Sequence, residues 1–206
     1  TLGDDLEYNV TIPSFTYNGV AYTSIRLGTN GVIAFGATTG DVPTGNTVLP
    51  ATTITAGNNF LAPYWDDLDV NLGGTIKTET VGNLFIIQYT NIDHNLFATG
   101  GITYQVQLNL TTGVISYVYQ DVVFGSATYD NGLTATVGLQ IGASSALQYS
   151  FNTASLSNGQ SICFTPIPTT PTVTFDWNAN PTYLSATNIA NPIATAVSSN
   201  QTYTVV

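Results

Sequence analysis

Apolar and polar residues alternate along most of the chain between Tyr8 and Phe164, and this alternation restricts the fold more than any other feature. The clearest run has apolar residues separated by single threonine, glutamine or asparagine residues, at Ile102, Tyr104, Val106, Leu108 and Leu110. A period of two places successive side chains on opposite faces of a β-strand. No stretch keeps the period of an amphipathic helix. We therefore predict an all-β protein.

Turn residues divide this pattern into short strands. Asn30-Gly31 separates Thr23–Leu27 from Val32–Phe35, and an Asn-Gly pair readily adopts the positive φ angles of a tight hairpin. Thr112-Gly113 precedes a returning strand at Val114–Tyr119. Further strands are predicted at Gly82–Thr90, Thr134–Ile141, Leu147–Asn152 and Ser161–Thr165. Many short strands between turns favour an antiparallel two-sheet β-sandwich.

The same alternation predicts the core of the sandwich. Hydrophobic residues make up 43% of the chain, which is enough to fill a core. Residues whose neighbours are polar should face inward, and these are Trp65, Ile86, Tyr104, Val106 and Leu108.

A change of composition after residue 165 predicts a second, smaller unit. Residues 166–171 contain three prolines, which favour an extended linker because each proline fixes φ and removes a backbone donor. Beyond the linker, only Thr172–Trp177, Ile193–Ala196 and Thr202–Val206 have the character of strands. A sandwich needs about seven strands. We therefore predict a complete domain over 1–165 and an incomplete β unit over 172–206.

The charge of the chain excludes several functions. Two Lys and Arg residues stand against 12 Asp and Glu residues, for a formal net charge of −10. A nucleic-acid-binding protein neutralises phosphates with many cations, so nucleic acid is not an expected partner, and neither is an anionic membrane surface. No apolar run reaches the length of about 20 residues that a membrane helix needs. The chain also lacks methionine, so we expect it to be part of a longer protein.

Several segments resemble a known family in their order along the chain. Residues 15–25 (FTYNGVAYTSI), 28–36 (GTNGVIAFG) and 61–69 (LAPYWDDLD) resemble parts of a nidogen-like (NIDO-like) domain. The resemblance continues through 85–92, 103–108 and 112–119, and in all it covers about residues 8–165. It implies an extracellular module, secreted or on the cell surface, and the family has no shared set of catalytic residues.

The resemblance also implies a setting. The most similar modules belong to large bacterial surface and adhesion proteins exported by the type IX secretion route. Residues 177–185, 189–194 and 202–205 resemble part of an immunoglobulin-like repeat, although the cysteines and first strands of that repeat are absent. Residues 172–206 are therefore expected to be an incomplete Ig-like segment.

An acidic run offers a candidate metal site. Asp66, Asp67, Asp69 and Asn71 lie within six residues, and their oxygens can converge on one side of an extended or looped segment. Calcium takes six to eight oxygen ligands, so these residues are candidate ligands for Ca²⁺. In the alternative interpretation, the same side chains cap turns or are simply solvated.

Catalytic chemistry has less support in the sequence. Asp66, Asp67 and Asp69 could form a glycosidase-like carboxylate pair, but nothing identifies an acid and a base. His94 lies in a segment rich in Asn and Gly, where we expect an exposed and inert side chain. Ser144 lacks the strand-to-helix turn of a nucleophile elbow, and Cys163 is expected to be a small buried hydrophobe.

Two functions from different classes remain. The first is a non-enzymatic extracellular structural or adhesive module of a large bacterial surface protein or filament, with other copies of itself or neighbouring domains as partners. The second is a lectin-like module that binds carbohydrate. Its sugar-stacking platform would come from the aromatic residues Tyr17, Tyr22, Tyr64, Trp65, Tyr117 and Tyr119, most of which we expect in the core or over sheet edges.

Overall fold

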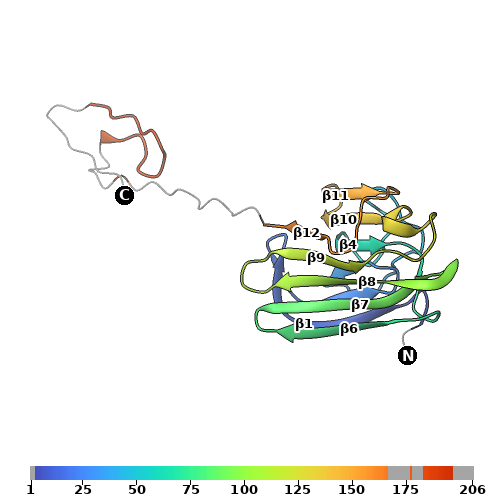
Figure 1. The fold of residues 1–206 in the computed structure, drawn as a ribbon. Coiled ribbons are helices and arrows are strands. Elements are labelled where there is room, and N and C mark those ends of the chain that lie inside the picture. Colours follow the sequence, from blue (N-terminus) through green and yellow to red (C-terminus); the bar gives the residue numbers. More distant parts are fainter. Residues whose placement is uncertain (1–2, 167–176, 178–182, 197–206) are drawn as a thin grey trace. The chain divides into compact units, whose positions relative to one another are not determined.

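A computed structural model of the chain describes residues 3–166, 177 and 183–196, without the side chains of residues 97–99. It divides into two compact units between Pro166 and Ile167. The first unit is built of antiparallel strands in two sheets (Figure 1), and its one helical element is a single 3₁₀ turn at Asp130–Gly132. The predicted fold class, an all-β two-sheet sandwich, is confirmed. Within the described part of the chain, no helix has the length and apolar character needed to cross a membrane.

The first sheet has the strand order β1-β2-β3-β4-β10-β11. Its strands are β1 (Glu7–Tyr17), β2 (Val20–Gly28), β3 (Ile33–Phe35), β4 (Asn59–Trp65), β10 (Thr136–Ile141) and β11 (Ala146–Phe151). The predicted hairpin around Asn30-Gly31 is present, with Leu27 paired to Ile33. Gly31 has a φ of 76°, and an ideal Cβ there would lie 1.9 Å from the Tyr64 carbonyl oxygen, so only glycine fits this turn.

The second sheet has the order β12-β9-β8-β7-β5, and β6 also pairs with β7. Its strands are β5 (Leu68–Asp69), β6 (Thr75–Val81), β7 (Leu84–His94), β8 (Phe97–Asn109), β9 (Ile115–Asp121) and β12 (Ser161–Phe164). The acidic run follows β4 directly in the sequence. The short β5 is important for the site, because its pairing with β7 places this run beside the end of β7.

The core prediction is correct for three of its five residues. Tyr104, Val106 and Leu108 are fully buried between the sheets. Ile86 was assigned to the wrong face: it is only half-buried, while its neighbours Phe85 and Ile87 point into the core. The run Leu84–Ile87 is apolar throughout, so it contains no alternation that would identify the inward face.

Trp65 is buried, but in a second core rather than between the sheets. The second core lies around β3 and β4 and is completed by apolar residues of the segment 37–58, which has no regular strand. Its buried members are Val32, Ala34, Val42, Leu49, Ala51, Ile54, Ala56, Phe60, Ala62 and Trp65. The indole N–H of Trp65 donates to the Pro43 carbonyl, 2.9 Å away. The segment 37–58 therefore covers one face of the first sheet, and β4 is buried on both sides.

Buried tyrosines connect the strands across the main core. Five of them donate hydroxyl hydrogen bonds of 2.7–3.4 Å to backbone carbonyls: Tyr17 to Gln140 and Phe60, Tyr64 to Tyr129, Tyr89 to Gly28, Tyr117 to Gly138 and Tyr119 to Pro63. These bonds allow large aromatic rings to fill the core with their polar ends satisfied.

In the second unit, the described residues form a small antiparallel arrangement. Leu184 pairs with Ala194 in an isolated bridge, and the Trp177 indole N–H donates to the Ile189 carbonyl, 2.8 Å away. The predicted runs Thr172–Trp177 (apart from Trp177 itself) and Thr202–Val206 lie outside the described residues, as does most of the predicted linker.

Candidate functional site

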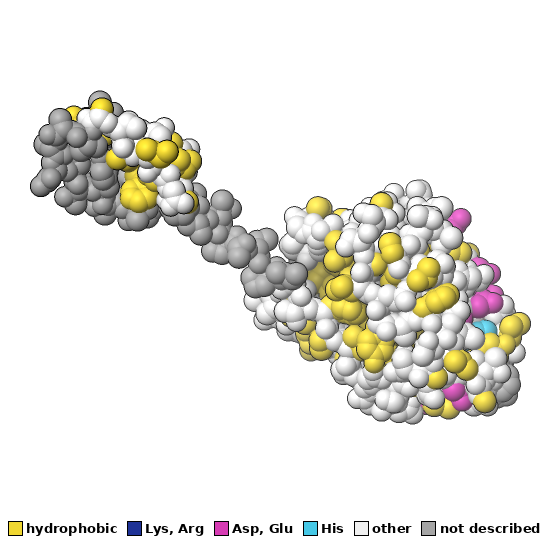
Figure 2. All heavy atoms as spheres, turned by 90° about the horizontal axis from the view of Figure 1, so that it is seen from above, with side chains coloured by type: hydrophobic (Ala, Val, Ile, Leu, Met, Phe, Trp, Pro, Cys, Tyr) yellow, Lys and Arg dark blue, Asp and Glu magenta, His cyan; other side chains and the backbone are white. Residues whose placement is uncertain are grey.

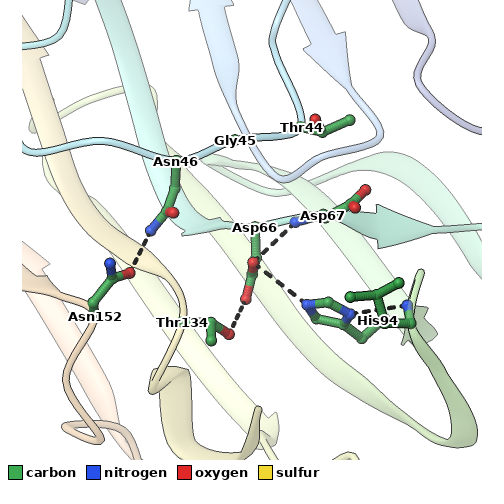
Figure 3. Close-up of a pocket in the computed structure, with 9 residues that line it drawn as sticks. Thr44, Gly45, Asn46, Asp66, Asp67, His94, Thr134 and Asn152 are labelled. Carbon is green, nitrogen blue, oxygen red and sulfur yellow. Dashed lines mark hydrogen bonds and ion pairs between the residues drawn. The ribbon is translucent and has the colours of Figure 1, made fainter. Parts of the chain in front are cut away.

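A pocket of about 260 Å³ opens where the acidic run meets the end of β7 (Figure 3). Its walls come from five separate parts of the chain: the segment 37–58, the junction of β4 and β5, the end of β7, and the residues flanking β10 and β11. They contribute Thr44, Gly45, Asn46, Asp66, Asp67, His94, Leu96, Thr134 and Asn152. The lining residues bring hydroxyl, amide, carboxylate and imidazole groups to the pocket, together with apolar surface that includes Leu96.

Asp66 is the central residue of the pocket. Its side chain is buried, and its Oδ2 accepts a hydrogen bond of 2.6 Å from the Thr134 hydroxyl. Its Oδ1 accepts the Asp67 backbone N–H at 3.0 Å and lies 3.5 Å from His94 Nε2. A buried carboxylate needs such partners, so Asp66 is fixed in place by three surrounding groups.

His94 is buried beside Asp66, which corrects the prediction of an exposed loop residue. It is only 3% exposed and is the last residue of β7. Its Nδ1 accepts the Leu96 backbone N–H at 3.1 Å, which leaves the ring proton on Nε2, facing Asp66. The ring stacks on Tyr129 with a centroid separation of 3.9 Å. These contacts hold the imidazole in one orientation.

Two asparagines lie side by side on another wall of the pocket. Asn46 Nδ2 donates to Asn152 Oδ1 at 2.8 Å and to the Thr136 hydroxyl at 3.1 Å. Figure 3 shows this amide pair across the pocket from His94. A ligand rich in hydroxyl groups would find both donors and acceptors here.

The four predicted calcium ligands are divided among different surroundings. Asp66 points to Thr134 and His94, whereas Asp67 Oδ2 accepts the side-chain amide of Asn95 at 3.0 Å. Asp69 Oδ1 accepts the backbone N–H of Asn71 at 2.7 Å, which is the turn-capping role of the alternative interpretation. Among the described residues, no three His, Cys, Asp or Glu side chains are grouped closely enough to hold a metal ion. Calcium binding by this set stays a prediction.

Comparison with known proteins gives one match. The model of a family described as NIDO related matches residues 1–177. The chain belongs to the NIDO-related family. No curated protein and no solved structure matches it. Membership of this family suggests an extracellular structural module. The family is not known for enzymatic activity.

One acidic residue of the NIDO-related domain was missed by sequence reasoning. Asp93 lies directly opposite Asp69, where β5 pairs with β7, and both carboxylates are buried. Burial raises the pKa of Asp93, and the neighbouring charge of Asp69 raises it further. Asp93 and His94 are adjacent on β7, so their side chains point to opposite faces. Only the register of β5 against β7 brings these two residues to the acidic run, and register cannot be read from the sequence.

Two further sequence predictions for the NIDO-related domain concern the cysteine and the aromatic residues. Cys163 is exposed on β12, with its Sγ 3.4 Å from the Ser116 hydroxyl, so the prediction of a buried cysteine was wrong. Of the aromatic residues considered for a sugar-stacking platform, all except Tyr22 are buried. They therefore belong to the core, as expected for most of them, and do not form a surface platform.

Proposed function

We propose that this NIDO-related domain is a non-enzymatic structural or adhesive module of a large bacterial surface protein or filament. The family match over residues 1–177 carries the proposal. More specifically, we propose that the protein to which this chain belongs is exported by the type IX secretion route, and that the second unit is part of an Ig-like repeat. Its partners would be other copies of itself or neighbouring domains. The resemblance of residues 177–185, 189–194 and 202–205 to such repeats supports the assignment of the second unit.

The chemistry of the surface supports a module that makes polar contacts. On the face of the first unit drawn in Figure 2, uncharged side chains and backbone make up most of the surface, with hydrophobic side chains among them, and most of the visible acidic side chains lie toward one side. The outer face of the second sheet carries a hydrogen-bonded row of glutamines, in which Gln107 donates to Gln105 and Gln105 to Gln88. Side chains bonded in this way are already ordered, so a partner that binds them immobilises few free rotamers.

The arrangement around His94 supports a non-enzymatic role. A triad needs a nucleophile hydrogen-bonded to the imidazole. Here the Thr134 hydroxyl donates to Asp66, and His94 Nδ1 is occupied by the Leu96 N–H. Within the described residues, His94 therefore has no serine, threonine or cysteine to activate.

The experiment is to locate the native protein on intact cells. An antibody against the domain, visualised by electron microscopy, should label the outside of the envelope, either as a layer or along filaments. Labelling confined to the cytoplasm of permeabilised cells would contradict the proposal. An antibody against a cytoplasmic protein is the control for leakage.

The pocket favours carbohydrate binding as a second candidate function. Its hydroxyl, amide and carboxylate groups match the groups that recognise sugar hydroxyls. A glycan array probed with the chain should then give saturable, sugar-specific binding. Asn46→Ala should abolish that binding, whereas Asn188→Ala, a matched substitution at an exposed position of the second unit, should retain it. Failure to bind any glycan above background would eliminate this candidate and leave the structural module intact.

A further inference from the structure

We propose that the buried carboxylates of Asp69 and Asp93 bind a divalent cation, with calcium the best fit. The two residues are direct partners in the pairing of β5 with β7. Cross-strand partners in an antiparallel pair project their side chains to the same face of the sheet, about 4.5–5.5 Å apart at Cβ. This site shares only Asp69 with the ligand set predicted from the sequence, and it does not depend on whether the domain is structural or carbohydrate-binding.

The observation that points to a ligand is the state of Asp93. The residue is 6% exposed, yet its carboxylate makes no hydrogen bond or ion pair with any described residue. Asp69 is 7% exposed, and among the described residues its carboxylate accepts one hydrogen bond, from the Asn71 N–H to Oδ1. Two like-charged carboxylates that lie side by side with little access to water repel each other. A bound cation offsets this repulsion, because its charge interacts favourably with both.

In the part of the chain that the structure describes, no Lys or Arg side chain forms an ion pair with Asp69 or Asp93. Arg26 forms its ion pair with Glu7, and Lys77 lies on β6 opposite Gln88. Further negative charge lies nearby instead: burial raises the pKa of Asp4, and the charges of Asp5, Asp69 and Asp67 raise it further. The region therefore has a negative potential that attracts a cation from solution.

The backbone at Gly73 lies close to Asp93, and a carbonyl oxygen lies near the same point. Gly73 has no side chain, and an ideal Cβ there would lie 2.7 Å from Asp93 Oδ2 and 3.7 Å from the Asn91 carbonyl oxygen. Calcium accepts carboxylate, carbonyl and water oxygens in flexible geometry, whereas magnesium demands a near-ideal octahedron. With two buried carboxylates as its charged ligands, the site should have the affinity of extracellular calcium modules, with Kd of about 10⁻⁴–10⁻³ M.

The experiment compares thermal melts in calcium and in chelator, at an ionic strength matched with sodium chloride. For the wild-type chain, calcium at a tenfold excess over Kd should raise Tm by about 3–6 °C. Asp93→Asn should lose this shift. In chelator, Asp93→Asn should melt at or above the wild-type temperature, because the repulsion between the two carboxylates is gone.

Asp41→Asn is the matched control, since it removes the same charge from an exposed side chain and should keep the calcium shift. Isothermal titration of the wild type with calcium chloride should give one site, and Asp69→Asn should weaken binding at least tenfold. This second variant keeps the test valid if Asp93→Asn does not fold. Superimposable wild-type melts in calcium and chelator, or a full calcium shift in Asp93→Asn, would overturn the proposal.

Discussion

At the scale of single residues, the core depends on where each buried tyrosine places its hydroxyl group. Tyr119 donates to the Pro63 carbonyl at 2.7 Å, whereas the buried hydroxyl of Tyr104 makes no hydrogen bond of good geometry with any described residue. The two rings are fully buried and close to each other, with centroids 6.2 Å apart. They therefore make a matched pair for measuring the contribution of one buried hydrogen bond.

Replacing these tyrosines with phenylalanine should have different effects on stability. Tyr119→Phe leaves the Pro63 carbonyl unpaired, so we expect the free energy of unfolding to fall by about 1–3 kcal/mol. Tyr104→Phe removes a hydroxyl that makes no hydrogen bond of good geometry with any described residue, so its effect should lie within about 0.5 kcal/mol or be stabilising. Urea denaturation of both variants measures the difference. Equal losses in the two would show that both hydroxyls are bonded in solution.

At the scale of strands, the sequence predicted the elements that have one buried face. Residues 102–109 of β8 alternate regularly, and both their strand state and their inward residues could be read from the pattern. In contrast, every residue of β4 from Phe60 to Trp65 is buried, because the segment 37–58 covers its outer side. Such a strand shows no alternation, so the second core could not be predicted.

The candidate site shows the same limit of sequence reasoning. Asp66 and Asp69 were recognised as candidate ligands because they lie close together in the sequence. Their actual neighbours, His94 and Asp93, are more than 20 positions further along and meet them only through the pairing of β5 with β7. A period-two pattern gives the face of a strand but not its partner or register. The chemistry of this site is therefore set by tertiary structure.

The assignment of faces in β7 and β8 can be tested by a pair of truncations. Leu108 is fully buried, so Leu108→Ala should cost about 2–5 kcal/mol of unfolding free energy. Ile86 points outward and is half-buried, so Ile86→Ala should cost clearly less, about 1 kcal/mol. Denaturant unfolding of the two variants provides the comparison. A larger loss for Ile86→Ala would mean that β7 presents its other face to the core.

At the scale of the whole molecule, the buried tyrosines make stability depend on alkaline pH. Burial raises the pKa of Tyr17, Tyr64, Tyr89, Tyr104, Tyr117 and Tyr119 above the ordinary value of 10. The folded state thus keeps these protons at a pH where the unfolded state loses them. Stability is full below pH 10 and falls as pH rises toward the folded-state pKa values.

Above pH 10, the six groups together should lower the free energy of unfolding by about 8 kcal/mol per pH unit. Because a domain has a total stability of only about 5–15 kcal/mol, it should unfold cooperatively within roughly two pH units. Tyrosinate absorbance and circular dichroism should then change together. Gradual ionisation of all the tyrosines without loss of β-structure would contradict the burial of these rings.

The second unit raises the question of whether copies of this protein assemble with one another. None of its described residues is buried, and Ile193 is 66% exposed. If the unit is incomplete, as its resemblance to part of an Ig-like repeat predicts, further chain of the same protein or a strand donated by a neighbouring copy would cover its apolar surface. A head-to-tail exchange of strands would not close on itself and would propagate into a filament.

We expect the first of these routes, because the resemblance to an Ig-like repeat predicts that its remaining strands belong to the same protein. Light scattering on residues 1–206 and on residues 1–166 distinguishes the two. Both proteins should remain monomeric at high concentration, since nothing then donates a strand in trans. If residues 1–206 polymerise while residues 1–166 stay monomeric, the second unit is the assembly element, and the filament forms by strand exchange between copies.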